Sequence, residues 1–200
     1  MRQLIFIIIL LKGYFSIAQN PIVDILDDDG SAITDTYYKD VNNLLNQFEG
    51  TYIYTNGSTS FKIVLVKKNQ QFNGRYYEDL IIGECQYIEN GVEKVNTINE
   101  LNIIYNNQRI HNINGNTLIN NNNRAWTCPS CNPGEKRLRT TIRDASTNRF
   151  AKLLMRRTTE GGQQVMKINI KHVSKAFQSE GEPTPSDFAL PLGEYTLIKQ

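Results

Sequence analysis

Apolar and polar side chains alternate along most of the chain, in short runs that end at turn residues. Three runs in the first half are followed by Asn-Gly pairs: Thr51–Tyr54, Ser60–Lys68 and Arg75–Glu89, with Asn56-Gly57, Asn73-Gly74 and Asn90-Gly91, and a fourth pair at Asn114-Gly115. A period of two is typical of a strand with one buried face, and type I′ turns need the positive φ that Asn and Gly tolerate. The pattern therefore predicts antiparallel hairpins, and Gly83 inside the third run predicts a bulge or a sharp bend.

The second half continues with longer alternating runs. They are Arg137–Arg143, Phe150–Arg157, Val165–Val173 and Gly193–Lys199, and the Asn-rich residues before them contain two expected short strands, Leu101–Tyr105 and Leu118-Ile119. Gly193-x-Tyr195 repeats Gly50-x-Tyr52, and an open meander would leave two exposed edges, so we expect the first and last strands to pair. The expected fold class is all-β, an antiparallel meander of about 8–10 strands that closes into a barrel.

A helical period occurs once, ahead of the first strand. Residues 37–48 have apolar side chains at the spacing of one helical face, namely Val41, Leu44, Leu45 and Phe48. They predict one short helix, capped by Asp35 or Thr36. Residues 19–36 contain the acidic cluster DILDDDGS without a period, which predicts a flexible acidic leader before a single β-barrel domain at 37–200.

The first eighteen residues have the pattern of a secretory signal peptide. An apolar run, Leu4–Leu11, follows Arg2, and the small residues Ser16 and Ala18 precede the expected cut after Ala18. A membrane anchor is the alternative, but Lys12 interrupts the run well before the roughly 20 apolar residues that a spanning helix needs. We therefore expect an exported protein, periplasmic or extracellular, without stable membrane insertion.

Charge is balanced overall but not along the chain. Cleavage would remove Arg2 and Lys12, which leaves 20 of the 22 basic residues against 20 acidic ones. Acidic residues dominate up to residue 100 and basic residues dominate after it. Such asymmetry can mark a face for nucleic acid or membrane, but in a barrel distant strands become neighbours and opposite charges can pair across them. Export argues further against nucleic acid.

Basic residues are most dense in the segment Lys136–Arg157, where Asp144 is the one acid. Arginine presents a planar fork of donors that suits phosphate or carboxylate, so Arg137, Arg139 and Arg143 are candidates for an anion-binding face. The alternative is that these side chains are the solvated outer faces of two strands.

The three cysteines allow one internal disulfide and leave one thiol. Cys128 and Cys131 form a CxxC motif with Asn-rich and Pro-Gly flanks, which favours a small disulfide-closed loop. A thiol-disulfide oxidoreductase would place this motif at a helix start in a βαβ unit. A zinc site would combine the pair with Cys85 and either His111 or His172, although these residues are scattered.

Aromatic residues concentrate on the predicted strands before residue 90: Tyr52, Tyr54, Phe61, Tyr76, Tyr77 and Tyr87. Inside a barrel they would form either a packed core or the lining of a ligand pocket. The sequence contains no phosphate loop, nucleophile elbow or HExxH motif. We therefore expect no catalytic residues, no cofactor and no metal, and hence a protein that is not an enzyme.

A short helix followed by Phe48-Glu49-Gly50-Thr51-Tyr52 resembles the start of lipocalin-like barrels, in which Gly-x-Trp opens the first strand. Tyrosine replaces tryptophan here, and the sequence does not identify the arginine that usually accompanies it. The combination of FEGTYIY, SFKIVLVK, RYYEDLIIGECQYIENG and GEYTLIK is similar to an uncharacterised family of exported Bacteroidota proteins, a domain of unknown function. This resemblance implies fold and export, and it implies no activity.

The sequence is compatible with three functions. The first is an exported, non-enzymatic barrel that binds a small apolar or amphipathic ligand in its interior. The second is a surface or periplasmic module with a filled core that binds a protein partner. The third is the thiol-disulfide oxidoreductase.

Overall fold

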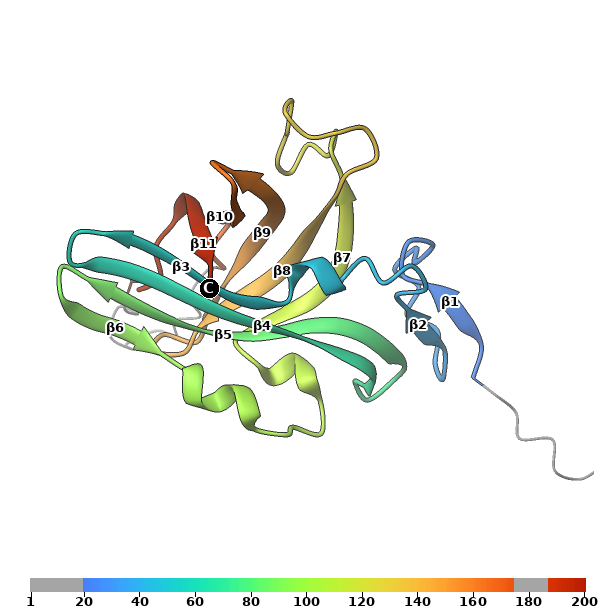
Figure 1. The fold of residues 1–200 in the computed structure, drawn as a ribbon. Helices are drawn as coiled ribbons and strands as arrows, with labels where there is room; N and C mark the ends of the chain where they lie inside the picture. The colour runs from blue at the N-terminus through green and yellow to red at the C-terminus, as the bar shows by residue number, and fades with distance from the viewer. Residues whose placement is uncertain (1–19, 175–186) are drawn as a thin grey trace, which may run out of the picture.

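The computed structural model describes residues 20–174 and 187–200, and these form a closed, eight-stranded antiparallel barrel (Figure 1). The barrel strands are β3 (Gly50–Asn56), β4 (Thr59–Phe72), β5 (Tyr77–Glu89), β7 (Ile113–Asn120), β8 (Lys136–Asp144), β9 (Arg149–Glu160), β10 (Gln163–Lys171) and β11 (Gly193–Lys199). Around the barrel their order is β5-β4-β3-β11-β10-β9-β8-β7. The all-β fold class is confirmed. The expected cut after Ala18 lies outside the described residues.

Two pairings between strands distant in sequence close the barrel. β11 pairs with β3, with Ile198 opposite Ile53, so the expected contact between first and last barrel strands is confirmed. β5 pairs with β7, with Gly83 opposite Ile113. The short β6 (Val92–Asn96) folds back on the end of β5 beside this seam. Gly83 lies in regular register with Leu65, and a Cβ there would fall 2.5 Å from the Val64 carbonyl oxygen, so close strand contact explains this glycine.

Three of the four Asn-Gly pairs are turns. Asn56-Gly57, Asn73-Gly74 and Asn90-Gly91 join β3 to β4, β4 to β5 and β5 to β6. The prediction for Asn114-Gly115 was wrong, because this pair lies inside β7. Gly115 has φ +148 and sits in a bulge between Asn114 and Thr117, where an added Cβ would lie 3.0 Å from Thr140 Cα. The glycine is needed for a bulge and a close approach to β8.

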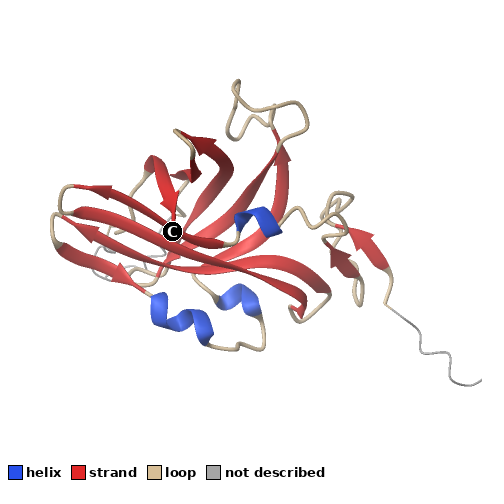
Figure 2. Ribbon diagram, viewed as in Figure 1, coloured by secondary structure: helices blue, strands red, loops and turns tan. Residues whose placement is uncertain are grey.

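The predicted helix at 37–48 was also wrong. Its residues form β2 (Tyr37–Lys39), turns and a 3-10 segment, η1 (Asn46–Phe48), and Figure 2 shows how short the helical segments are. Asp40 accepts hydrogen bonds from the backbone N–H groups of Leu44 and Leu45, both at 2.8 Å, and Asn43 has φ +54, which interrupts an α-helix. In the described part of the chain, no helix is long and apolar enough to span a membrane.

The Asn-rich region contains one of its two expected strands. Leu118 and Ile119 belong to β7, which confirms that prediction. The prediction for Leu101–Tyr105 was wrong, because two 3-10 segments, η2 (Ile98–Asn102) and η3 (Gln108–Ile110), build a loop over the outer face of β5. The alternation of Leu101, Ile103 and Tyr105 is typical of a strand. In the structure, side-chain hydrogen bonds hold this region as a loop.

The acidic leader contributes to the folded structure. Within it, β1 (Ile22–Asp24) pairs in parallel with β2, and β2 pairs in parallel with the start of β5. Asp79 on β5 accepts the Tyr37 hydroxyl at 2.6 Å and the Asp40 N–H at 2.9 Å. These charge-assisted bonds tie the small β1–β2 unit to the barrel. Figure 1 shows this unit at one end of the barrel.

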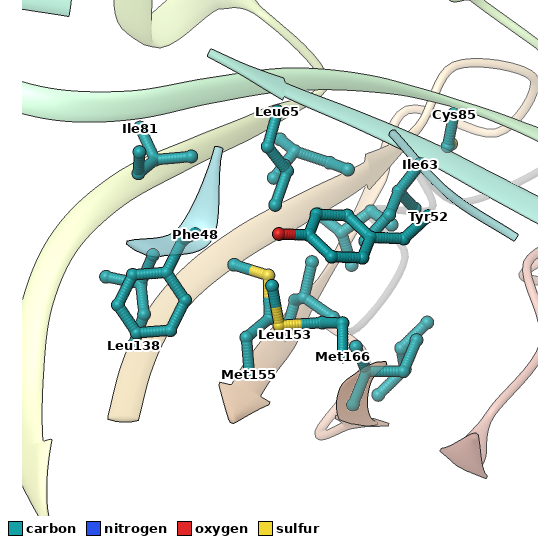
Figure 3. Close-up of a cluster of buried hydrophobic side chains, with 14 of the residues drawn as sticks. Phe48, Tyr52, Ile63, Leu65, Ile81, Cys85, Leu138, Leu153, Met155 and Met166 are labelled. Atoms are coloured by element: carbon teal, nitrogen blue, oxygen red, sulfur yellow. The ribbon is translucent and has the colours of Figure 1, made fainter. Parts of the chain in front are cut away.

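The barrel interior is filled with side chains (Figure 3). The largest of them come from both halves of the barrel: Phe48, Tyr52, Phe61, Ile63, Leu65, Leu138, Leu153, Met155 and Met166, all buried. Burying each such side chain stabilises the fold by roughly 1.5–3 kcal/mol. The Arg157 guanidinium lies 5.8 Å from the centre of the Tyr52 ring and donates to the Gln47 carbonyl at 3.0 Å. Lys199 of β11 also lies over this ring, with its Nζ 6.0 Å from the ring centre, so two cations flank Tyr52.

Candidate functional site

A hollow of about 390 Å³ opens at the end of the barrel where β5 finishes and β11 begins. Its lining comes from β5, β6, β11 and the segment before β11: Tyr87, Glu89, Lys94, Asp187, Phe188, Ala189, Leu190, Pro191, Leu192 and Tyr195. We call it the mouth hollow. Tyr87 and Leu190 belong both to this lining and to the packed core, so the hollow adjoins the filled interior.

Aromatic packing builds the floor of the mouth hollow. The Tyr87 ring packs edge-on against Phe61 of the interior with ring centres 6.1 Å apart, and Tyr195 packs against Tyr54 at 5.1 Å. Edge-to-face pairs of this kind add about 0.5–1.5 kcal/mol beyond area burial. The alternation of β3, β4, β5 and β11 brings these four rings together, so the floor is set by strand register.

A buried carboxylate holds the wall of the mouth hollow. Asp144, at the end of β8, accepts the Ala189 N–H at 2.7 Å and the hydroxyls of Ser146 and Thr147 at 2.6 and 2.8 Å. Burial acts to raise the pKa of Asp144, but these hydrogen bonds outweigh it and lower the pKa below its usual value. The Tyr195 hydroxyl also donates to the Leu192 carbonyl at 3.0 Å, which fixes the segment before β11.

Polar groups stand at the rim of the mouth hollow. The Tyr87 hydroxyl donates to Glu89 at 3.1 Å, and Lys94 lies 3.6 Å from the same carboxylate. Burial, with the contribution of Glu89, raises the pKa of Tyr87 to about 12, so this hydroxyl remains protonated at neutral pH. Asp187 adds a second carboxylate to the lining. An aromatic floor with one ammonium and two carboxylates around it suits a molecule with an apolar and a polar end.

The structure separates the six aromatic pocket candidates. Tyr87 lines the mouth hollow, and Tyr54 supports it through Tyr195, whereas Tyr52 and Phe61 are buried in the packed interior. The last two lie at the opposite end of β5: Tyr76 packs against Tyr38 and Tyr77 packs against Phe72, both with ring centres 5.0 Å apart. The six residues therefore do not line one cavity.

The expected disulfide is confirmed. Cys128 and Cys131 are joined with an S–S distance of 2.06 Å, in the loop between β7 and β8. The third cysteine, Cys85, points into the barrel interior, where burial and the charge of Glu84 raise the pKa of its thiol to about 12. Among residues 20–174 and 187–200, no three His, Cys, Asp or Glu side chains converge in a way that could hold a metal ion.

The disulfide loop lies over arginines of the barrel's outer face. Arg156 donates to Glu135 at 2.6 Å and to the Ser130 carbonyl at 3.1 Å. The Trp126 ring covers Arg137, whose guanidinium carbon lies 5.3 Å from the ring centre. The CxxC motif therefore closes a loop anchored to the sheet, and no helix follows it.

The three anion-face candidates have different surroundings. Arg137 is buried, and although it donates to the Asn120 carbonyl at 2.9 Å, two of its nitrogens have no hydrogen-bond partner. Burial, followed by the charge of Arg156, lowers its pKa. Arg143 donates to the Asn112 side chain at 2.8 Å. Arg139 borders a second hollow, so the three arginines do not form one open face.

Sequence reasoning missed a polar cluster buried on the outer side of β5. His111 Nδ1 lies 2.8 Å from Glu84 Oε1, and the Asn112 amide donates to Glu84 Oε2 at 2.7 Å and to Glu100 at 3.1 Å. The signal was Glu84 itself, a charge within the apolar run of β5. Because His111 and Glu84 are fully enclosed, this cluster holds the loop of η2 and η3 onto the barrel.

Comparisons with known proteins give one result. A family model described as "Family of unknown function (DUF6705)" matches residues 1–200. No curated protein and no solved structure gave a significant match.

Proposed function

Because the chain belongs to DUF6705, a family of unknown function, we propose its role from its own geometry: an exported, non-enzymatic barrel that binds a small amphipathic ligand in the mouth hollow. One observation carries the proposal. A hollow of about 390 Å³ with an aromatic floor and charged rim opens at the end of a barrel that is otherwise packed.

The size and lining of the hollow support this role. Pockets for small molecules enclose roughly 300–1,000 Å³ and combine apolar walls with a few placed polar groups. Tyr195, Phe188 and Leu192 offer the apolar surface, and Lys94 and Glu89 offer the charges. The ligand would lie at the mouth, because the interior that lipocalin-like barrels could use is occupied by Tyr52 and Phe61.

Export is supported by two features. The Cys128–Cys131 disulfide is of the kind that persists in oxidising compartments. The first eighteen residues have the charge, apolar run and small residues of a cleavable signal. A periplasmic or extracellular location would also give the ligand direct access to the hollow.

A fluorescent amphipathic probe tests the site. We expect 1-anilinonaphthalene-8-sulfonate to bind the folded chain saturably, and Leu192→Glu to weaken binding about tenfold, because it removes apolar contact and repels the sulfonate. The matched control is Ile198→Glu, an exposed apolar residue of β11 outside the hollow, which should leave binding unchanged. Equal weakening by both variants, or no saturable binding, would count against the mouth hollow.

Exposed isoleucines favour a second function, binding of a protein partner. Ile104 is 90% exposed on the loop of η2 and η3, and Ile103 and Ile110 of the same loop are also exposed. We expect Ile104→Asp to remove a cross-linked species of defined mass in the cell envelope of the host. Val92→Asp changes an apolar residue of β6 that is 58% exposed, and it should retain that species. The same cross-linking pattern for both variants would exclude this loop as the interface.

A further inference from the structure

A second hollow lies on the outer face of the barrel, over strands β7, β8 and β9. Its volume is about 230 Å³, and its lining consists of Arg109, Asn114, Gly115, Thr117, Arg139, Thr140, Thr141 and Lys152. We call it the Arg139 hollow. The lining contains three basic residues and no acidic one, unlike the rim of the mouth hollow, where Glu89 accompanies Lys94.

Strand register gathers these side chains. Asn114 of β7 lies opposite Thr141 of β8, which in turn lies opposite Lys152 of β9, and cross-strand neighbours point to the same side of a sheet. Arg139 is two residues from Thr141 on the same outward face, since Leu138 and Ile142 point into the core. The hollow is therefore lined by side chains on the outer face of β7, β8 and β9.

The bulge in β7 shapes the hollow. Two residues, Gly115 and Asn116, oppose the single residue Thr140 between the pairs that Asn114 and Thr117 make with β8. A bulge interrupts the ladder and increases local twist, so the strand bends where the hollow forms. Asn116 donates to Glu78 at 2.9 Å and to the Asp79 carbonyl at 2.9 Å, which fixes the bulged backbone against β5.

The charges of the hollow are incompletely paired. Arg109 makes a bidentate ion pair with the buried Glu78, so its charge is balanced and its position fixed. Within the described ranges, Arg139 and Lys152 form no ion pair and their side chains make no hydrogen bond to the protein. Arg139 is half-buried, and its guanidinium has no counter-charge among the described residues.

We propose that the Arg139 hollow binds a phosphate-type oxyanion. The guanidinium of Arg139 offers a planar fork that matches two oxygens of a phosphoryl group, Lys152 adds a second positive charge, and the Thr141 hydroxyl can donate a further bond. The ligand is either free phosphate or the phosphoryl end of a larger molecule, because both present the same oxygens. The site is distinct from the mouth hollow and shares no lining residue with it.

Calorimetric titration of the full chain with inorganic phosphate at constant ionic strength tests the proposal. We expect saturable binding, weakened about tenfold or more by Arg139→Gln, because hydrogen bonds between charged groups are worth about 1.5–3 kcal/mol. Lys152→Gln should weaken binding by a smaller factor, because this side chain is exposed and screened by solvent. Lys62→Gln, on the outer face of β4 across the barrel, removes the same charge elsewhere and should change nothing.

The same titration identifies the source of the phosphoryl group. Glycerol 3-phosphate and vesicles containing phosphatidic acid replace inorganic phosphate in two further arms, and dependence on Arg139 in any arm supports the site. The proposal is overturned if no arm shows saturable binding, or if Lys62→Gln weakens binding as much as the two variants in the hollow. Should Arg139→Gln fail to fold, the exposed Lys152 still provides the comparison with Lys62.

Discussion

Single residues determine how closely the strands of this barrel approach. Gly83 and Gly115 both occupy places where a Cβ has no room, next to Val64 and Thr140. The sequence indicated a special role for Gly83, because a glycine interrupts an apolar run, but it misassigned Gly115, because Asn-Gly has the same appearance in a turn and in a bulge. The pairing of Arg157 with Tyr52 had no sequence signal, since the two lie on strands distant in the chain.

Gly83→Ala tests this close approach. Its Cβ would lie 2.5 Å from the Val64 carbonyl oxygen and 2.6 Å from a Leu65 methyl carbon. The carbonyl belongs to the backbone of a paired strand, so it cannot move aside as an exposed side chain can. We expect the free energy of unfolding in urea to fall by about 1–3 kcal/mol or more. Gly162→Ala, in a turn with open space around it but positive φ, should cost only about 1 kcal/mol. A smaller loss for Gly83→Ala than for Gly162→Ala would refute the steric explanation.

At the scale of elements, strands were predictable and short irregular segments were not. The alternation of apolar and polar side chains in Ser60–Lys68 predicts a strand, because one face of the strand packs in the core and the other is exposed to water. The segment 37–48 shows the limit: Leu45 and Phe48 do reach the core, but through turns that Asp40 organises rather than along a helix. Likewise, Glu84 lies on the outer side of β5, and the loop of η2 and η3 encloses it there.

Asp144 links two elements, the end of β8 and the segment before β11, and its pKa makes that link dependent on pH. A pKa lower in the folded chain than the ordinary 3.8 means that the carboxylate stabilises the fold above that pH. This contribution is lost as the pH falls from about 3.8 through the folded value. Asp144→Asn should therefore lower the free energy of unfolding by about 1–3 kcal/mol at pH 7.

Urea unfolding at several pH values checks the Asp144 prediction. The difference between Asp144→Asn and the parent should shrink in acid, where the parent carboxyl is protonated as well. Asp27→Asn changes an exposed carboxylate of the leader and should leave the free energy of unfolding unchanged at pH 7. A difference for Asp144→Asn that stays constant from neutral to acid pH would contradict the account.

At the scale of the whole molecule, closure of the barrel was predictable and its contents were not. The repeated Gly-x-Tyr of β3 and β11 indicated the closing pair, which the structure confirms. Whether Tyr52, Phe61 and Tyr87 surround a ligand or fill the core depends on side-chain volumes from every strand at once, so the pattern of one strand could not decide it. The structure fills the interior and leaves the space at the mouth.

Native mass spectrometry of the protein purified from its own host tests this account most directly. We predict a small-molecule adduct at one copy per chain, lost on Leu192→Glu and retained on Ile198→Glu, because only the first residue lines the mouth hollow. The bare mass of the chain in the parent protein, or an adduct that both variants retain, would contradict a ligand in the mouth hollow.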